Sequence, residues 1–171
     1  MNNKKNILDT HPHLKDFLDF LPKLNEESDR GAVLIAATMI EDLLEKVLHS
    51  FLIKGKTADR LLTGFNAPLG TFSAKIAACA AMGLITDNEH EDIEIIRKVR
   101  NDFAHTIHMS FKTQKIVDHC SKLHHSAKSY DDVIVGSKGQ FTTGATSIIL
   151  NLTNRPHYVE KTKITKRNWP Y

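Results

Sequence analysis

The sequence predicts an all-α protein, a compact bundle of about five helices with a small β-hairpin extension at its C-terminal side. Apolar residues recur at three- and four-residue spacing through most of residues 14–125. Proline, glycine and capping residues separate these stretches, as expected between helices. After Tyr130 the pattern changes to runs of β-branched residues separated by glycines. We therefore expect a helical domain over residues 1–128, followed by a β-hairpin extension and basic tail over residues 129–171.

The first part of the chain predicts two helices. A short one covers residues 14–21 and ends before Pro22, because proline interrupts helical hydrogen bonding. The second runs over residues 29–53 and carries a wide apolar stripe, which is typical of a central helix packed on more than one side. Lys54, Gly55 and Lys56 end it with two cations and a glycine stop.

Three further helices follow a loop at residues 61–70. An alanine-rich helix over residues 71–82 stops at Gly83, and the connection to the next helix is very short. That next helix runs from Asp87 to about Ile107, so the two are expected to be antiparallel neighbours. One more helix is expected over residues 113–125.

The C-terminal part predicts strands and a tail. Residues 133–135 and 147–152 are rich in valine and isoleucine, and Gly136 to Gly139 between them read as a turn. Residues 155–167 carry five basic residues against Glu160 alone. Basic residues near aromatics could contact nucleic acid. A tail of this kind is more often simply solvated, and we favour that interpretation here.

Composition excludes several classes of protein. The chain of 171 residues is 41% hydrophobic and has a net charge of +3. This charge is too small to indicate a nucleic-acid-binding protein by itself. Its two cysteines are far apart, which favours reduced thiols in a cytoplasmic protein. No apolar run has the length of a membrane span, so no membrane partner is expected.

Residues 100–105, Arg-Asn-Asp-Phe-Ala-His, carry the candidate site. On a helix they place Arg100, Asn101 and His105 on a polar side, together with Arg97 and His108, within a sector of roughly 140°. Asn101 and His105 are neighbours at i, i+4 spacing, whereas Arg100 and His105 lie toward opposite edges of that sector. One phosphate could bridge them. The alternative interpretation of such a face is an ordinary solvated helix surface.

Two further acidic residues, Glu41 and Asp42, lie in the middle of the predicted central helix and could reach an arginine of the motif helix. A structural ion pair is the favoured interpretation. Cys120 and His124 have a spacing that suits zinc, but four well-placed ligands are not evident. We therefore expect no metal site and no cofactor.

The order of motifs resembles the mannitol operon repressor family. The residues that carry the resemblance are Ala67-Pro68-Leu69-Gly70, the alanine-rich stretch after them, Met82-Gly83-Leu84-Ile85 and the Arg100–His105 motif. The resemblance covers about residues 28–125. It implies an α-helical fold and a transcriptional regulator that works through protein contacts. A helix-turn-helix with a basic recognition helix is not evident, so direct reading of DNA has weak support.

An arginine five residues before a histidine also resembles the signature of the HEPN superfamily, small helical domains found in RNA-cleaving toxins and defence systems. The resemblance implies a metal-independent endoribonuclease that acts as a homodimer, with a regulatory protein or antitoxin as a further partner. His105 would transfer protons, Arg100 would stabilise the phosphorane and Asn101 would orient the phosphate. Glu41, Asp42, Arg97 and His108 would support them, and the product would carry a 2′,3′-cyclic phosphate.

Overall fold

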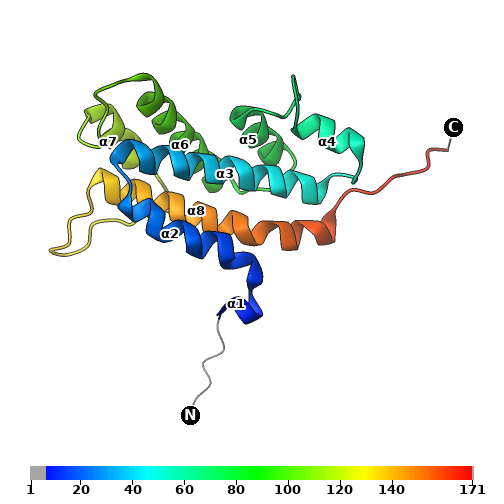
Figure 1. The fold of residues 1–171 in the computed structure, drawn as a ribbon, viewed down its shortest axis with the longest axis horizontal. Helices are drawn as coiled ribbons and strands as arrows, with labels where there is room; N and C mark the ends of the chain where they lie inside the picture. Colours follow the sequence, from blue (N-terminus) through cyan, green and yellow to red (C-terminus); the bar gives the residue numbers. More distant parts are fainter. Residues whose placement is uncertain (1–6, 171) are drawn as a thin grey trace, which may run out of the picture.

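The computed structural model describes residues 7–170 and is all-α over that range (Figure 1). No strand occurs there; the single β feature is an isolated bridge between Tyr130 and Val133. The helices are α1 (Ile7–Thr10), the 3-10 helix η1 (Pro12–Leu14), α2 (Lys15–Glu26), α3 (Asp29–Phe51), α4 (Lys56–Leu62), α5 (Phe72–Ala81), α6 (Asp87–His105), α7 (Gln114–Cys120), α8 (Ser137–Val159) and the 3-10 helix η2 (Glu160–Thr162).

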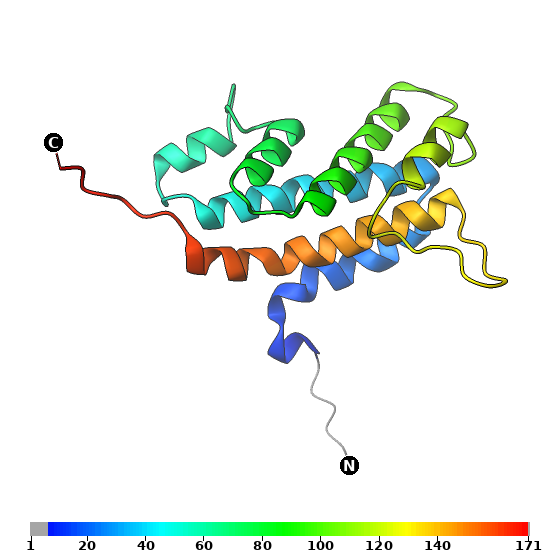
Figure 2. The same ribbon diagram turned by 180° about the vertical axis from the view of Figure 1, so that it is seen from behind.

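Two long helices, α3 and α8, run side by side through the centre of the molecule (Figures 1 and 2). Helix α2 packs against both of them on one side, and α5 and α6 pack against α3 on the other. Because α3 contacts helices on several sides, its stripe of buried residues is wide, as its sequence predicts. No helix of the described chain is long and apolar enough to span a membrane.

The predicted β-hairpin is wrong: residues 137–159 form the 23-residue helix α8. Its buried residues recur at helical spacing: Phe141, Ala145, Ile148, Ile149 and Leu152. The β-branched residues favour strands locally, but the gain from burying them against α3 outweighs that preference. Gly136 does not form a turn; it is the extended residue that precedes α8.

Glycine inside α8 has a packing role. A Cβ at Gly144 would lie 3.3 Å from Leu123 Cδ1, so the glycine allows α8 to approach the segment that follows α7 closely. The buried side chains of α8 and those of the preceding helices belong to one hydrophobic cluster. The division of the chain into two domains near residue 128 stays a prediction, and the core itself draws on both sides of that position.

Other helix boundaries differ in detail from the expectation. Helix α2 continues past Pro22 to Glu26, because Leu24 on its last turn is buried in the core. The helix expected over residues 113–125 stops at Cys120. The buried Asp92 carboxylate there accepts the backbone N–H groups of His124, at 2.7 Å, and His125, at 2.9 Å, which gives these amides partners outside a helix.

A buried ion pair fixes α8 against α6. Glu89, only 2% exposed, accepts a hydrogen bond from Arg155 Nη2 at 2.6 Å. Arg155 Nη1 also donates to the Leu84 carbonyl at 2.8 Å. The other Glu89 oxygen accepts the backbone N–H of Thr86 at 2.8 Å, which completes the capping box at the start of α6. Arg155, which the sequence places at the start of a basic tail, is therefore a structural residue of α8.

Candidate functional site

Helix α6 presents the motif, and it ends earlier than its sequence predicts. The capping box of Thr86 and Glu89 begins it, and His105 is its last residue. Thr106 is extended, with φ −121° and ψ 118°, so Ile107 and His108 lie in the following turn. The prediction that His108 shares the polar face of this helix is therefore wrong, and Ile107, the predicted end of the helix, lies exposed beyond it.

Arg30 of α3 explains this early end. Its guanidinium donates hydrogen bonds to three carbonyl groups at the end of α6, those of Phe103, Thr106 at 2.7 Å and Ile107 at 2.9 Å. A cation at a helix C-terminus satisfies carbonyls that have no partner within the helix and complements the helix dipole. This role of Arg30 is not predictable from the sequence, because more than seventy residues separate Arg30 from the carbonyls and no spacing signal connects them.

Arg100 and Asn101 lie together at a polar pocket. Arg100 Nη1 donates to Asn101 Oδ1 at 3.0 Å. Both residues line a cavity of about 330 Å³, which we call the polar pocket. Its other lining residues come from α3, α6 and the start of α5: Glu41, Arg97, Thr71, Phe72 and Ser73. The pocket thus combines guanidinium, amide and hydroxyl groups with the Glu41 carboxylate, which pairs with Lys75. Its guanidinium and amide donors suit a small oxyanion or a polar side chain of a partner.

Arg97 is held by its own helix. It makes a two-pronged contact with Glu94, from Nη2 to Oε2 at 2.8 Å and from Nε to Oε1 at 3.2 Å. This hydrogen-bonded contact lowers the pKa of the Glu94 carboxyl and raises the pKa of Arg97, against the smaller opposing effect of burial. Arg97 therefore has fewer free donors than Arg100 to offer a ligand in the polar pocket.

His105 is not among the residues that line the polar pocket. Its side chain is exposed and makes no hydrogen bond with any residue in the described range. Exposure leaves the His105 imidazole accessible to an external group, whereas burial against apolar side chains would have prevented such contact. A single chain nevertheless does not bring Arg100, Asn101 and His105 into one cavity.

The two acidic residues of α3 have different surroundings. Glu41 lines the polar pocket, and its ion pair is with Lys75 Nζ at 3.6 Å rather than with an arginine. Lys75 is buried and also pairs with Glu45 at 2.7 Å, so this cluster has a structural role between α3 and α5. Asp42 is exposed, does not line the polar pocket and forms no ion pair with another described residue.

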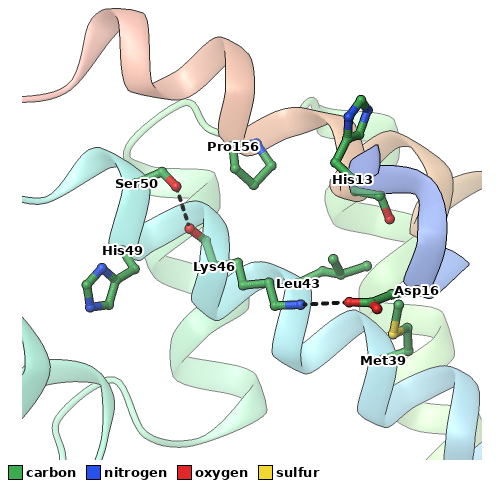
Figure 3. A pocket seen from close by; sticks show the side chains of 9 residues that line it. His13, Asp16, Met39, Leu43, Lys46, His49, Ser50 and Pro156 are labelled. Carbon is green, nitrogen blue, oxygen red and sulfur yellow. Dashed lines mark hydrogen bonds and ion pairs between the residues drawn. The ribbon is translucent and has the colours of Figure 1, made fainter. Parts of the chain in front are cut away.

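A larger cavity lies on another side of α3, and no motif in the sequence predicts it. Figure 3 shows this pocket, of about 490 Å³, between η1, α2, α3 and α8. Met39, Leu43 and Pro156 supply apolar side chains, and Lys46 lies 3.7 Å from Asp16. Met39 and Leu43 are spaced i, i+4, as are Lys46 and Ser50. This spacing, apolar residues beside polar ones along one edge of α3, is the sequence signal for a partly covered edge.

The comparisons with known proteins concern the fold. One chain of the X-ray structure of the MtlR-HPr complex from Escherichia coli is similar to this protein, with a TM-score of 0.61 and 20% sequence identity. The similarity covers 85% of this chain and 99% of that chain. The two chains share a fold. No family model matches the sequence, and neither does any curated protein. The all-α fold expected from the resemblance to mannitol operon repressors is thus confirmed, while the HEPN resemblance stays a prediction.

Proposed function

We propose that this protein is a non-catalytic regulator of the mannitol repressor type that works through contact with a partner protein. The observation that carries the proposal is the fold similarity to a chain of a two-protein complex, which extends over 99% of that chain. A regulator of this kind needs a stable scaffold and an exposed surface, and it needs no assembled catalytic centre.

The geometry of the motif supports this choice. Arg100 and Asn101 line the polar pocket, whereas His105 does not. Among its described residues, a single chain therefore has no histidine to transfer protons beside the Arg100 and Asn101 donors. General acid–base catalysis requires the proton-transferring group within hydrogen-bond reach of the reacting atoms. Recognition of a partner requires no such arrangement, and Arg100 with unused donors suits an interface because guanidinium groups bind carboxylates and phosphates in a defined geometry.

The test is calorimetric titration of this protein with purified HPr, the protein named with MtlR in the similar structure. We expect saturable binding at a simple stoichiometry, with unchanged affinity for His105→Ala and reduced affinity for Arg100→Ala. Asp42→Ala serves as a surface control because Asp42 is exposed and lies outside the polar pocket. Absence of any heat or of complex formation with HPr would contradict a partner of this kind.

The second candidate function is a metal-independent endoribonuclease. The observation that favours it is that exposed His105 and the Arg100–Asn101 pair occupy the same helix, α6. A second copy of the chain would then have to supply the missing group, because in-line transfer at phosphorus works best with both an acid and a base. The homodimer predicted from the sequence is part of this second proposal, because only a second copy would complete the catalytic groups.

Incubation of the protein with mixed RNA in excess EDTA tests the nuclease directly. Cleavage that leaves 2′,3′-cyclic phosphate ends and is lost in His105→Ala would establish it and overturn the non-catalytic proposal. His157→Ala is the matched control, since His157 is also an exposed histidine but lies on α8. If the folded wild-type protein leaves the RNA intact, the nuclease is excluded, and partner recognition stands as the function of the Arg100–His105 motif.

A further inference from the structure

A projecting turn at residues 130–134 exposes an unusual set of side chains, and we call it the acidic tip. Tyr130 is 83% exposed and Ile134 is 87% exposed, and Val133 between them is also exposed. Asp131 and Asp132 add two carboxylates that form no ion pair with another described residue. Large apolar residues gathered on a protruding loop are costly to leave in water and are typical of a contact surface.

The acidic tip is a folded turn. The backbone groups of Tyr130 and Val133 exchange two hydrogen bonds, at 3.1 Å and 3.0 Å. Asp131 adopts φ +51°, a left-handed conformation that aspartate tolerates better than most residues. The N–H of Val135 donates to Ser129 Oγ at 2.9 Å and closes the base of the turn. A turn already held in shape loses less conformational entropy when it binds, which favours insertion into a partner.

A cavity of complementary character lies at the other end of the molecule. Near the ends of α3 and η2, a cavity of about 400 Å³ has an apolar part formed by Leu52, Ile53 and Ile164. Its charged residues are Lys54, Lys56 and Lys166, and we call it the lysine pocket. The backbone bond from Ile164 N–H to the Phe51 carbonyl, at 3.0 Å, holds the C-terminal segment at this pocket.

Charge in the lysine pocket is only partly neutralised. Lys54 pairs with Glu160 at 3.5 Å, whereas Lys56 and Lys166 pair with no carboxylate of the described residues. The pocket therefore offers apolar surface beside two unpaired ammonium groups. The acidic tip offers apolar surface beside two unpaired carboxylates. Complementary charge of this kind favours encounter and sets the orientation of a complex.

The two surfaces cannot meet within one chain. Figures 1 and 2 both place the turn between α7 and α8 at one end of the long axis, and α4 with the C-terminal segment at the other. A surface that complements a different surface on the same molecule generates a head-to-tail contact between copies. We propose that this protein self-associates head to tail, with the acidic tip of one copy inserted in the lysine pocket of the next.

Such a contact is small, so it is expected to be concentration-dependent and weakened by salt, which screens the charged part. It is also distinct from a symmetric dimer, because each copy uses two different surfaces. Repetition gives a chain or a closed ring of copies. It goes beyond the partner contact proposed above and uses none of the residues of the polar pocket.

Sedimentation velocity over micromolar to millimolar protein tests the proposal with two complementary variants. The tip variant is Tyr130→Ser with Ile134→Ser, two exposed residues whose side chains make no contribution to the core. The pocket variant is Lys56→Glu with Lys166→Glu, which repels an intact acidic tip. Phe65→Ser, another highly exposed residue, is the control and should behave as wild type. Circular dichroism checks that all variants are folded.

The wild type is expected to rise in average mass with concentration, while neither variant does so alone. An equal mixture of the two variants should form pairs and stop there, because only one competent tip and one competent pocket remain between them. An average mass independent of concentration in the wild type would overturn the proposal. So would a mixture that forms no pairs, or a variant that associates as the wild type does. Association of the pocket variant by itself is what a symmetric contact between two tips would give, because that variant keeps an intact acidic tip.

Discussion

Substitution of Arg155 tests the most consequential correction to the expected fold, the replacement of a hairpin by α8. In Arg155→Met the Glu89 carboxylate stays buried and loses its cationic partner at 2.6 Å, and the Leu84 carbonyl loses its donor at 2.8 Å. Glu89 keeps the Thr86 N–H at 2.8 Å and the Asn151 amide at 3.3 Å. Breaking a fully buried pair from one side costs about 3–5 kcal/mol.

Partial exposure reduces that figure. The Arg155 side chain is 23% exposed, so water can reach the vacated position and solvate part of the carboxylate. We therefore expect the free energy of unfolding to fall by about 2–3 kcal/mol in Arg155→Met. For a domain of this size the midpoint of thermal unfolding would drop by several degrees.

Urea unfolding followed by far-ultraviolet circular dichroism measures the effect. The slope of the free energy of unfolding against urea concentration is expected to stay unchanged. The double variant Glu89→Gln/Arg155→Met should lose less than the sum of its single variants, since the two side chains interact directly. Lys163→Met is the control, because its pair with Glu160 spans 3.9 Å between exposed side chains and should matter little. A loss below about 0.5 kcal/mol in Arg155→Met would refute the reasoning.

Three further predictions concern other contacts. Arg30→Met should increase hydrogen exchange in the last turn of α6 and cost about 1–2 kcal/mol in urea unfolding, because the terminal carbonyls lose their donors; unchanged exchange there would contradict the capping role. Burial raises the pKa of both Cys79 and Cys120 to about 12, so iodoacetamide at pH 8 should label neither until the chain unfolds, and rapid labelling of the folded protein would disprove this. Burial lowers the pKa of His119 below 6.5, so in mildly acidic solution the unfolded chain binds a proton at this residue more readily than the folded chain does. The free energy of unfolding should therefore decrease as pH falls below about 6.5, and the decrease should be smaller in His119→Gln.

The start of the motif helix shows what local sequence can predict. Thr86 and Glu89 satisfy each other's backbone groups over a spacing of three residues, so the capping box can be read from the local sequence, and the predicted start of the helix at Asp87 is confirmed. The stop at Gly83 is confirmed for the same reason, because its φ of +66° suits glycine and is set by the adjacent turn. Such contacts span a few residues and are visible in any local window.

The end of the same helix shows the opposite case. Helix α6 ends at His105 rather than at Ile107. The hydrogen-bond donors to the carbonyl groups at this end belong to Arg30, which lies on another helix. The Glu41 carboxylate likewise pairs with Lys75, which no spacing rule connects to it. Prediction of these partners requires the packing of α3 against α5 and α6, which is a property of the folded chain.

By itself, the sequence determined that residues 14–125 are built mainly from helices, that the motif helix begins after Thr86, and that Arg100, Asn101 and His105 share that helix. Only the tertiary structure decided that residues 137–159 form a helix, because burial against α3 overrides the strand preference of Ile148 and Ile149. It also decided that Arg100 lines the polar pocket while His105 does not. Helical periodicity assigns side chains to faces, but which faces enclose a cavity depends on where distant helices pack.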